Sequence, residues 1–183
     1  MRFYILGLLT LLLISCKKGK SREKLVVLLK EWEQKEIVFP SRMFFTVQGE
    51  DSVNCSIKEQ YKVLVYTDSM GCTGCKIRLA DWKNFMHQVE SVSTDSVQFL
   101  FFFFPKERME LYRTLQMNLF DEPVCIDEKD SLNLLNRFPQ RMDFQTFLLN
   151  EDNQVVAVGN PVYNSKVRDL YLKILSRNES QKT

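Results

Sequence analysis

The chain has 183 residues, 45% of them hydrophobic and 26% charged, with a net charge of +2 at pH 7. This composition indicates one globular domain with additional segments, and it excludes a disordered or low-complexity chain. Because basic and acidic side chains nearly balance, at 25 and 23, there is no electrostatic reason to expect nucleic acid as a partner.

The first residues have the pattern of a secretory signal. Arg2 is followed by an apolar run over residues 3–14, and the small residue Ser15 comes next. The run is too short to span a bilayer as a permanent helix, whereas a basic start, a short apolar stretch and a small residue are typical of a signal peptide. We therefore predict an extracytoplasmic protein, in a compartment where disulfides persist.

The end of this signal resembles the bacterial lipobox, in which a cysteine is lipidated and becomes the first mature residue. The resemblance rests on Leu13-Ile14-Ser15-Cys16. It implies a lipoprotein signal peptide over residues 1–15, acyl chains such as palmitate on Cys16, and a polar tether over residues 16–24. It also implies a membrane-anchored lipoprotein that faces the periplasm. An ordinary signal peptide with an incidental cysteine is the alternative.

Residues 25–56 are predicted to form an N-terminal extension that packs on the main domain. A helix is expected over residues 22–36, followed by a strand over residues 43–48 that stops at the turn residues 49–52. The helix is expected to bury the apolar side chains that recur at helical spacing: Leu25, Leu28, Leu29 and Trp32.

The main domain, residues 57–178, begins with two strongly apolar strands. A β-branched strand is expected over residues 62–67, and residues 97–104, which contain five phenylalanines, are expected at the centre of the sheet. A short strand over residues 123–127 follows. The domain closes with a hairpin whose strands cover residues 145–150 and 155–159.

Helices are expected between and after these strands, over residues 72–89, 106–118, 130–137 and 164–177. The alternation predicts an α/β fold, with a central mixed sheet that is largely parallel, helices on both of its faces and an antiparallel hairpin at one edge. The helices are expected to turn inward Leu79, Trp82, Met86 and Val89, then Met109, Leu111, Tyr112 and Leu115, and finally Val167, Leu170, Tyr171, Ile174 and Leu175.

The chemistry is expected in Cys72-Thr73-Gly74-Cys75, which follows the first buried strand and opens the first of these helices. Two cysteines separated by two residues close a small ring easily, so the pair can cycle between dithiol and disulfide. A cysteine at a helix start is favoured as a thiolate by unpaired backbone N–H groups and by the helix dipole. We therefore predict that Cys72 is the nucleophile and that Cys75 resolves the mixed disulfide.

The strand, the turn, the Cys72-Thr73-Gly74-Cys75 motif and the hairpin from Thr146 to Val156 together resemble the thioredoxin superfamily. The strand–helix unit near residues 123–137 resembles its TlpA-like, membrane-anchored extracytoplasmic branch, which occurs in lipoproteins of Bacteroidota. The resemblance covers roughly residues 57–178. It implies a thioredoxin-like fold, an oxidoreductase whose only cofactor is its cysteine pair, protein disulfides or thiols as substrates, and a membrane or periplasmic electron donor.

The chain departs from that family at three positions. Gly71 stands where the family has a tryptophan, and Tyr66 stands where it often has a buried carboxylate, with Asp68 nearby on the turn. Phe144, preceded by Asp143, stands at the position of the family's cis-proline, in the loop that contacts substrate. Asp143 and Phe144 are thus the candidates for the substrate loop. A cis bond before a residue other than proline costs ~3 kcal/mol, so Phe144 is expected to be trans.

These departures keep a second function open, a non-catalytic thioredoxin-like binding module in which Cys72–Cys75 is a structural disulfide. No metal site is expected, because a zinc site needs a second pair of ligands and Cys55, Cys125 and His87 are scattered along the chain. Copper delivery by the two thiolates, with Met70 as a neighbour, is a minor option. Cys55 and Cys125 either pair with each other or stay free.

Overall fold

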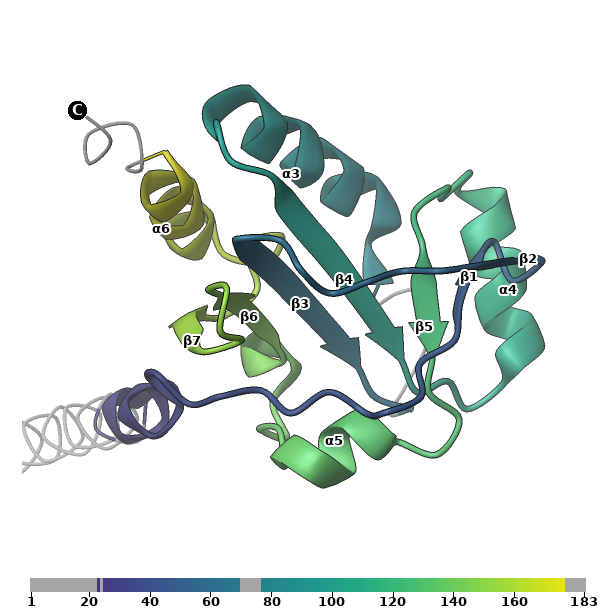
Figure 1. Ribbon diagram of the computed structural model, residues 1–183, viewed down its shortest axis with the longest axis horizontal. Coiled ribbons are helices and arrows are strands. Elements are labelled where there is room, and N and C mark those ends of the chain that lie inside the picture. Colours follow the sequence, from purple (N-terminus) through teal and green to yellow (C-terminus); the bar gives the residue numbers. More distant parts are fainter. Residues whose placement is uncertain (1–22, 24, 70–76, 177–183) are drawn as a thin grey trace, which may run out of the picture.

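The computed structural model of the chain describes residues 23, 25–69 and 77–176, which form an α/β fold around one seven-stranded mixed sheet (Figure 1). The strand order is β2-β1-β5-β4-β3-β6-β7. In chain order the strands are β1 (Phe45–Val47), β2 (Asp51–Val53), β3 (Tyr61–Thr67), β4 (Val97–Phe103), β5 (Val124–Ile126), β6 (Thr146–Leu149) and β7 (Val155–Val158).

Residues 25–32 form a helix ahead of the sheet, and a single 3₁₀ turn, η1 (Met142–Phe144), precedes β6. The remaining helices are α3 (Leu79–Val92), α4 (Arg108–Met117), α5 (Ser131–Asn136) and α6 (Ser165–Leu175). Helices α4, α5 and α6 lie close to their predicted positions, whereas the first helix ends earlier and α3 begins later than predicted.

The phenylalanine-rich strand β4 is the middle strand of the seven, as predicted. It runs parallel to β3, with Val65 opposite Phe101, and parallel to β5, with Phe102 opposite Cys125. A strand in this position is covered on both faces, so a continuous apolar run suits it better than alternation with polar residues. Residues 100–103 are accordingly all buried.

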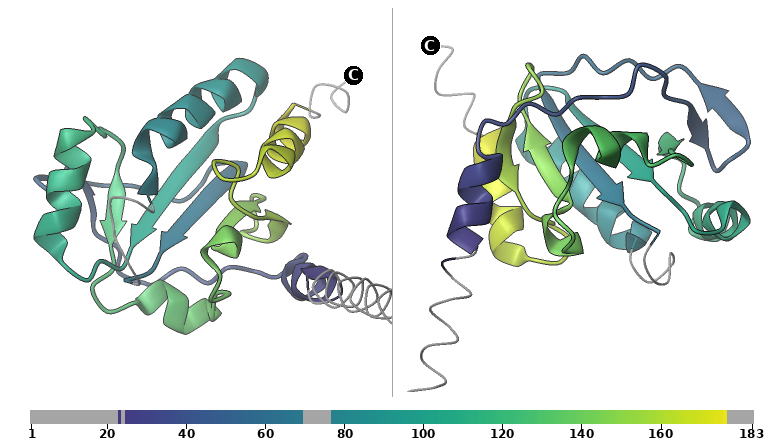
Figure 2. Two further views of the ribbon diagram at one scale, coloured as in Figure 1. Left: turned by 180° about the vertical axis from the view of Figure 1, so that it is seen from behind. Right: turned by 90° about the horizontal axis from the view of Figure 1, so that it is seen from below.

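Successive residues of the central strands point to opposite faces of the sheet, and each face has its own core. On one face Val63, Val65 and Phe101 pack with buried side chains of α3, α4 and α6. On the other face Leu64 and Phe102 pack with buried side chains of the first helix and α5. Helices therefore cover both faces, as predicted, with α3 and α5 on opposite sides of the sheet (Figure 2).

The N-terminal extension adds two strands to the main sheet, only one of which the sequence predicted. Residues 49–52 do not end the strand structure, because the chain reverses at Gln48 and Gly49 and returns as β2. Gly49 has φ +83°, and a Cβ there would overlap the ring of Tyr112. The first strand of the hairpin, β1, pairs antiparallel with β5, with Phe45 opposite Cys125. The extension therefore forms one edge of the sheet.

Some predicted inward positions are wrong. In the first helix Trp32 is buried and Leu28 partly buried, but Leu25 and Leu29 are exposed, and the helix ends at Trp32 instead of reaching residue 36. Met109 and Leu170 are also exposed, at 61% and 45%. The first helix, α4 and α6 therefore bury a narrower stripe of apolar residues than their spacing predicted. Single exposed apolar residues cost little free energy, so the fold tolerates them.

Asn136 at the end of α5 fastens the N-terminal segment to the second face of the sheet. Its side chain is almost fully buried and accepts a hydrogen bond from the Val38 N–H at 2.9 Å. The side-chain amide of Asn136 donates to the Val38 and Leu132 carbonyls, both at 2.8 Å. A buried amide that makes all these hydrogen bonds fixes the positions of the two segments that it joins, α5 and the N-terminal segment.

Candidate functional site

The candidate redox motif lies in the segment that connects β3 to α3. Cys72 and Cys75 fall outside the described residues, as does the lipidation candidate Cys16. The described chain stops at Ser69, just after β3, and resumes at Ile77, which is buried beside α3. The motif therefore belongs to the short segment that leaves the carboxyl end of a central strand.

The structure corrects one part of the helix prediction. Arg78 has left-handed backbone angles, φ 47° and ψ 49°, and serves as the N-cap of α3, which begins at Leu79. A left-handed residue interrupts an α-helix, so α3 does not run continuously from Cys72 to Val89. Ile77, immediately before Arg78, is itself helical, so the described residues place a break in the helix at Arg78. The placement of Cys72 at a helix start stays a prediction. The predicted core stripe of Leu79, Trp82, Met86 and Val89 is confirmed.

A cavity of about 590 Å³ opens at the carboxyl end of β3, next to the last described residue before the motif. Its polar side chains come from three parts of the chain that are distant in sequence. It is lined by Tyr66, Asp68, Ser69, Phe104, Asp130, Asn133, Phe138, Pro139, Gln140, Met142 and Gln145.

Gln145 connects the loop before β6 to the end of β3. Its side chain is 4% exposed and donates to Asp68 Oδ2 at 3.2 Å and to the Pro139 carbonyl at 3.0 Å. The Gln145 carbonyl accepts the Tyr66 N–H at 3.0 Å. Gln145 thus holds the loop against the strand from which the motif segment departs.

Tyr66 occupies the position at which the resembling family often has a carboxylate. It is 3% exposed, and its hydroxyl donates to Asp130 Oδ1 at 2.6 Å. Burial, the hydrogen bond to Asp130 and the nearby carboxylates raise the pKa of Tyr66 well above its usual value. The phenol therefore stays protonated at neutral pH and acts as a donor, not as a base. Strand β3 has no carboxylate at this position; instead, the Tyr66 hydroxyl bonds to the carboxylate of Asp130.

The substrate-loop candidates Asp143 and Phe144 lie in η1, beside this cavity's wall but not among its lining residues. Asp143 forms an exposed ion pair with Arg141 at 2.6 Å, and the Arg141 guanidinium lies 4.9 Å from the centroid of the Phe144 ring. All peptide bonds of the described residues are trans, including the one at Phe144. Their role in binding substrate stays a prediction.

Sequence reasoning missed Met142 and Gln145, which flank Asp143 and Phe144 and line the cavity, as well as Asp130. The one sequence signal for Gln145 is that it is polar and directly precedes the buried strand β6. Nothing local marks Asp130, because it meets Tyr66 across 64 residues of sequence.

Two cysteines lie among the described residues, Cys55 and Cys125, and both are free. Cys55 is half-buried, and its sulfur accepts a hydrogen bond from Gln98 Nε2 at 3.2 Å. Cys125 is 3% exposed in β5, and burial raises the pKa of its thiol to about 12. Cys125 is therefore a protonated, unreactive core residue, as its predicted strand position suggested.

The raised pKa of Cys125 predicts loss of stability in alkali. The unfolded thiol ionises near its ordinary pKa of 9.0, whereas the folded thiol keeps its proton up to about 12. Between these values only the unfolded state gains from ionisation, so the free energy of unfolding falls by about 1.4 kcal/mol per pH unit from this residue. We expect the free energy of unfolding, measured by urea denaturation in reducing buffer, to fall less steeply between pH 9 and 10.5 for Cys125→Ala than for the wild type.

Cys55→Ala is the matched control for this experiment, because burial raises the pKa of Cys55 as well but the Gln98 hydrogen bond opposes the shift. Its profile should stay closer to that of the wild type. Equal slopes for the wild type and Cys125→Ala would show that Cys125 is not the group responsible.

Neither a metal site nor a membrane span is found in the described part of the chain. Over these residues, no group of three or more His, Cys, Asp and Glu side chains is placed to hold a metal ion. Within the same residues, no helix has the length and apolar character needed to cross a bilayer. The single histidine, His87, is exposed on α3 and contacts Glu90 at 3.2 Å.

Comparison with known proteins defines the class of the fold. No protein-family model matches the chain, and no curated protein sequence matches it significantly. Solved structures do match, and they establish that the fold is thioredoxin-like. One is the thioredoxin domain of a thiol-disulfide oxidoreductase from Bacteroides vulgatus, with 9% identity and a TM-score of 0.58 over 78% of this chain and 97% of that chain. Another is peroxiredoxin Q from Xanthomonas campestris, with 14% identity and a TM-score of 0.52 over 72% of this chain and 90% of that chain.

Proposed function

We propose that the chain is a membrane-anchored, extracytoplasmic thiol–disulfide oxidoreductase whose redox pair is Cys72 and Cys75. One observation carries the proposal: the Cys-Thr-Gly-Cys motif lies in the segment between β3 and α3 of a thioredoxin-like fold. The carboxyl ends of parallel strands are where α/β sheets present their functional groups. The redox names of the similar structures support the same class of reaction.

The proposed reaction is a two-electron exchange between the protein and a substrate disulfide. The Cys72 thiolate attacks one sulfur of the substrate, forms a mixed disulfide and releases the other substrate sulfur as a thiolate. The Cys75 thiolate then attacks the Cys72 sulfur and releases the second substrate thiolate. The protein ends as the Cys72–Cys75 disulfide, and a membrane or periplasmic dithiol donor reduces it again. With an oxidised protein and a dithiol substrate the same steps run in reverse.

The described residues next to the motif supply a binding surface for a polypeptide substrate. The cavity at the end of β3 presents Asp68, Gln145 and Met142 beside the segment that carries the cysteines. Asp143 and Phe144, which lie between Met142 and Gln145, are proposed to contact the substrate backbone. Lipidation of Cys16 would hold this surface at the periplasmic side of a membrane.

The test of this function is a glutathione redox titration of residues 17–183, with mass spectrometry to locate each disulfide. We expect Cys72 and Cys75 to pair with each other at a reduction potential between about −120 and −270 mV, the range of exchange-competent pairs. A potential below about −300 mV, or Cys72 bonded to a different cysteine, would contradict the proposal.

A non-catalytic thioredoxin-like binding module is the second candidate, and Tyr66 is the observation that favours it. Tyr66 is a protonated phenol at the position where the resembling family often has a buried carboxylate, so this described residue supplies no base for the cysteine pair. In this alternative the Cys72–Cys75 disulfide is structural and the loop of Asp143 and Phe144 contacts a partner. The redox titration separates the two candidates.

A further inference from the structure

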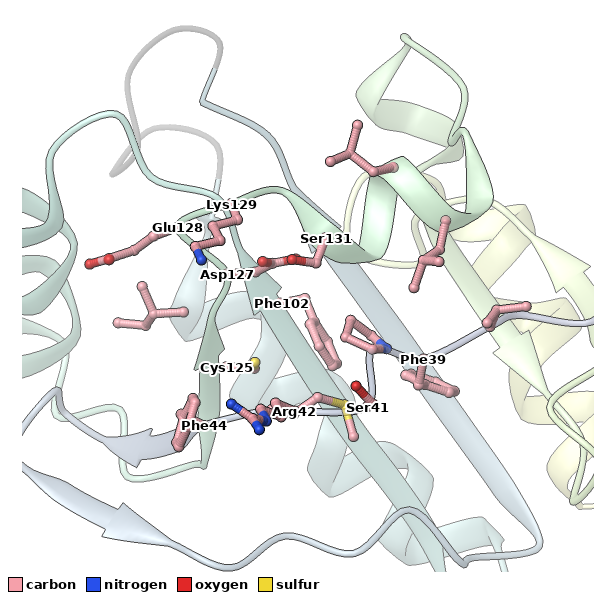
Figure 3. Close-up of a pocket in the computed structure, with 16 residues that line it drawn as sticks. Phe39, Ser41, Arg42, Phe44, Phe102, Cys125, Asp127, Glu128, Lys129 and Ser131 are labelled. Carbon is pink, nitrogen blue, oxygen red and sulfur yellow. The ribbon is translucent and has the colours of Figure 1, made fainter.

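A groove on the second face of the sheet lies apart from the candidate redox site. It has a volume of about 940 Å³ and runs between the extended segment of residues 38–44 on one side and α5 with the loop after β5 on the other (Figure 3). The short helix α5 separates it from the cavity at the end of β3, because Asn133 lines that cavity whereas Leu134 and Leu135 line the groove. Its volume falls at the upper end of the range for small-molecule sites, roughly 300–1,000 Å³.

The floor of the groove is apolar. Phe102 and Cys125 lie beneath it in β4 and β5 and are almost fully buried, and Phe39 and Met43 of the N-terminal segment, both partly exposed, pack against this core and form the accessible surface of the floor. The thiol of Cys125 is protonated, as shown above, so the floor carries no charge. An extended peptide laid on Phe39 and Met43 would leave its backbone amides facing a ring and a methyl group, which is costly. A hydrocarbon chain has no such cost.

The walls of the groove expose large apolar side chains that a ligand would cover. Phe44 and Leu134 are each 71% exposed, and Leu135 and Val38 are about half exposed. Isolated exposed apolar residues are ordinary, but a contiguous concave group of them is typical of a binding site. Each methylene that a ligand buries here contributes favourably to binding.

The charges at the rim favour an anionic group. Glu128 is directed away from the groove and is paired with Arg108 at 3.0 Å, and Asp127 Oδ2 accepts the Leu132 N–H at 2.7 Å. In contrast, neither Arg42 nor Lys129 has a hydrogen-bond or ion-pair partner among the described residues. These two cations come from opposite walls, so the rim offers two unpaired positive charges against the one negative charge of Asp127, while Glu128 is paired with Arg108.

We propose that this groove binds a long-chain monocarboxylate, with its hydrocarbon tail on the apolar floor and its carboxylate at Arg42 and Lys129. A charge-assisted hydrogen bond from Arg42, supported by Lys129, fixes the head group. The proposal is independent of the redox chemistry, because it uses neither Cys72 nor Cys75.

The test is an NMR titration with decanoate below its micellar concentration. The chain is labelled with ¹³C at its methionine methyl groups. The Met43 resonance, assigned with Met43→Leu, is expected to shift in a saturable way. Met117 is 85% exposed on α4, away from the groove, and serves as the internal control that should not shift. Equal shifts at both methionines, or none at Met43, would overturn the proposal.

The head group is tested with matched ligands and matched variants. Decanol and decyltrimethylammonium carry similar tails without the negative charge, and we expect each to bind at least about tenfold more weakly than decanoate. Arg42→Ala and Lys129→Ala should each weaken decanoate binding severalfold, whereas Arg113→Ala, which removes an exposed cation from α4, should not. Equal binding of decanol, or a groove that takes an acidic apolar peptide but not decanoate, would contradict the assignment.

Discussion

Replacing Cys72 with serine is expected to abolish thiol–disulfide exchange, with a loss of more than about 100-fold in the rate of insulin disulfide reduction. A serine hydroxyl does not attack a disulfide under these conditions, so the first bond of the proposed reaction cannot form. The rate is measured with dithiothreitol as the electron donor, against the uncatalysed reaction. A Cys72→Ser variant that retains full activity would exclude Cys72 as the nucleophile.

The companion variant Cys75→Ser distinguishes the two roles. It keeps the attacking thiol but lacks the resolving one, so we expect the mixed disulfide between Cys72 and the substrate to accumulate. Mass spectrometry under non-reducing conditions measures this adduct. Cys55→Ala is the matched control, because it removes a described thiol that takes no part in the proposed exchange. If Cys75→Ser turned over normally, the assignment of Cys75 as the resolving residue would be wrong.

The largest effect on stability is expected at Phe101. This side chain is fully buried in the middle strand, and its ring contacts Trp82 and Phe120 edge-on, at centroid distances of 5.6 and 5.1 Å. Truncation to alanine removes these contacts and leaves a cavity that α3 and β4 cannot close, at a cost of about 3–5 kcal/mol. Urea denaturation followed by circular dichroism measures the change.

Phe44→Ala provides the comparison, since that ring is 71% exposed. Substitutions at such positions change stability by less than about 0.5 kcal/mol. Similar losses for both variants would mean that the face of the sheet between β4 and α3 is not the close-packed core that the structure shows.

The parts of the fold that could be predicted from the sequence are those with a long and unambiguous local pattern of apolar and turn residues. Strands β3 and β4 contain the continuous apolar runs 63–66 and 99–103, and the hairpin of β6 and β7 is marked by turn residues between two apolar stretches. The central place of β4 followed because only a middle strand is covered on both faces.

The rest depended on contacts that no local pattern records. The missed strand β2 has three residues, too few for periodicity, and the pairing of the predicted strand β1 with β5, some eighty residues later, leaves no local signal. The candidate site shows the same limit. The motif is visible in the sequence, but the Gln145–Asp68 contact joins side chains 77 residues apart.

The attachment of the N-terminal segment, residues 34–47, has a consequence for the order of folding. Apart from the neighbouring strand β2, the partners that attach it to the domain come from late in the chain: Gln34 and Ile37 bond to Val155 and Asn153, Val38 bonds to Asn136, and β1 pairs with β5. A chain that emerges amino end first therefore presents Ile37 and Phe45, both nearly fully buried in the folded state, long before their partners are made. Loop closure over this distance is slow compared with local structure formation. The segment of residues 34–47 is thus made early but completes its contacts only after residues 124–155 have been synthesised.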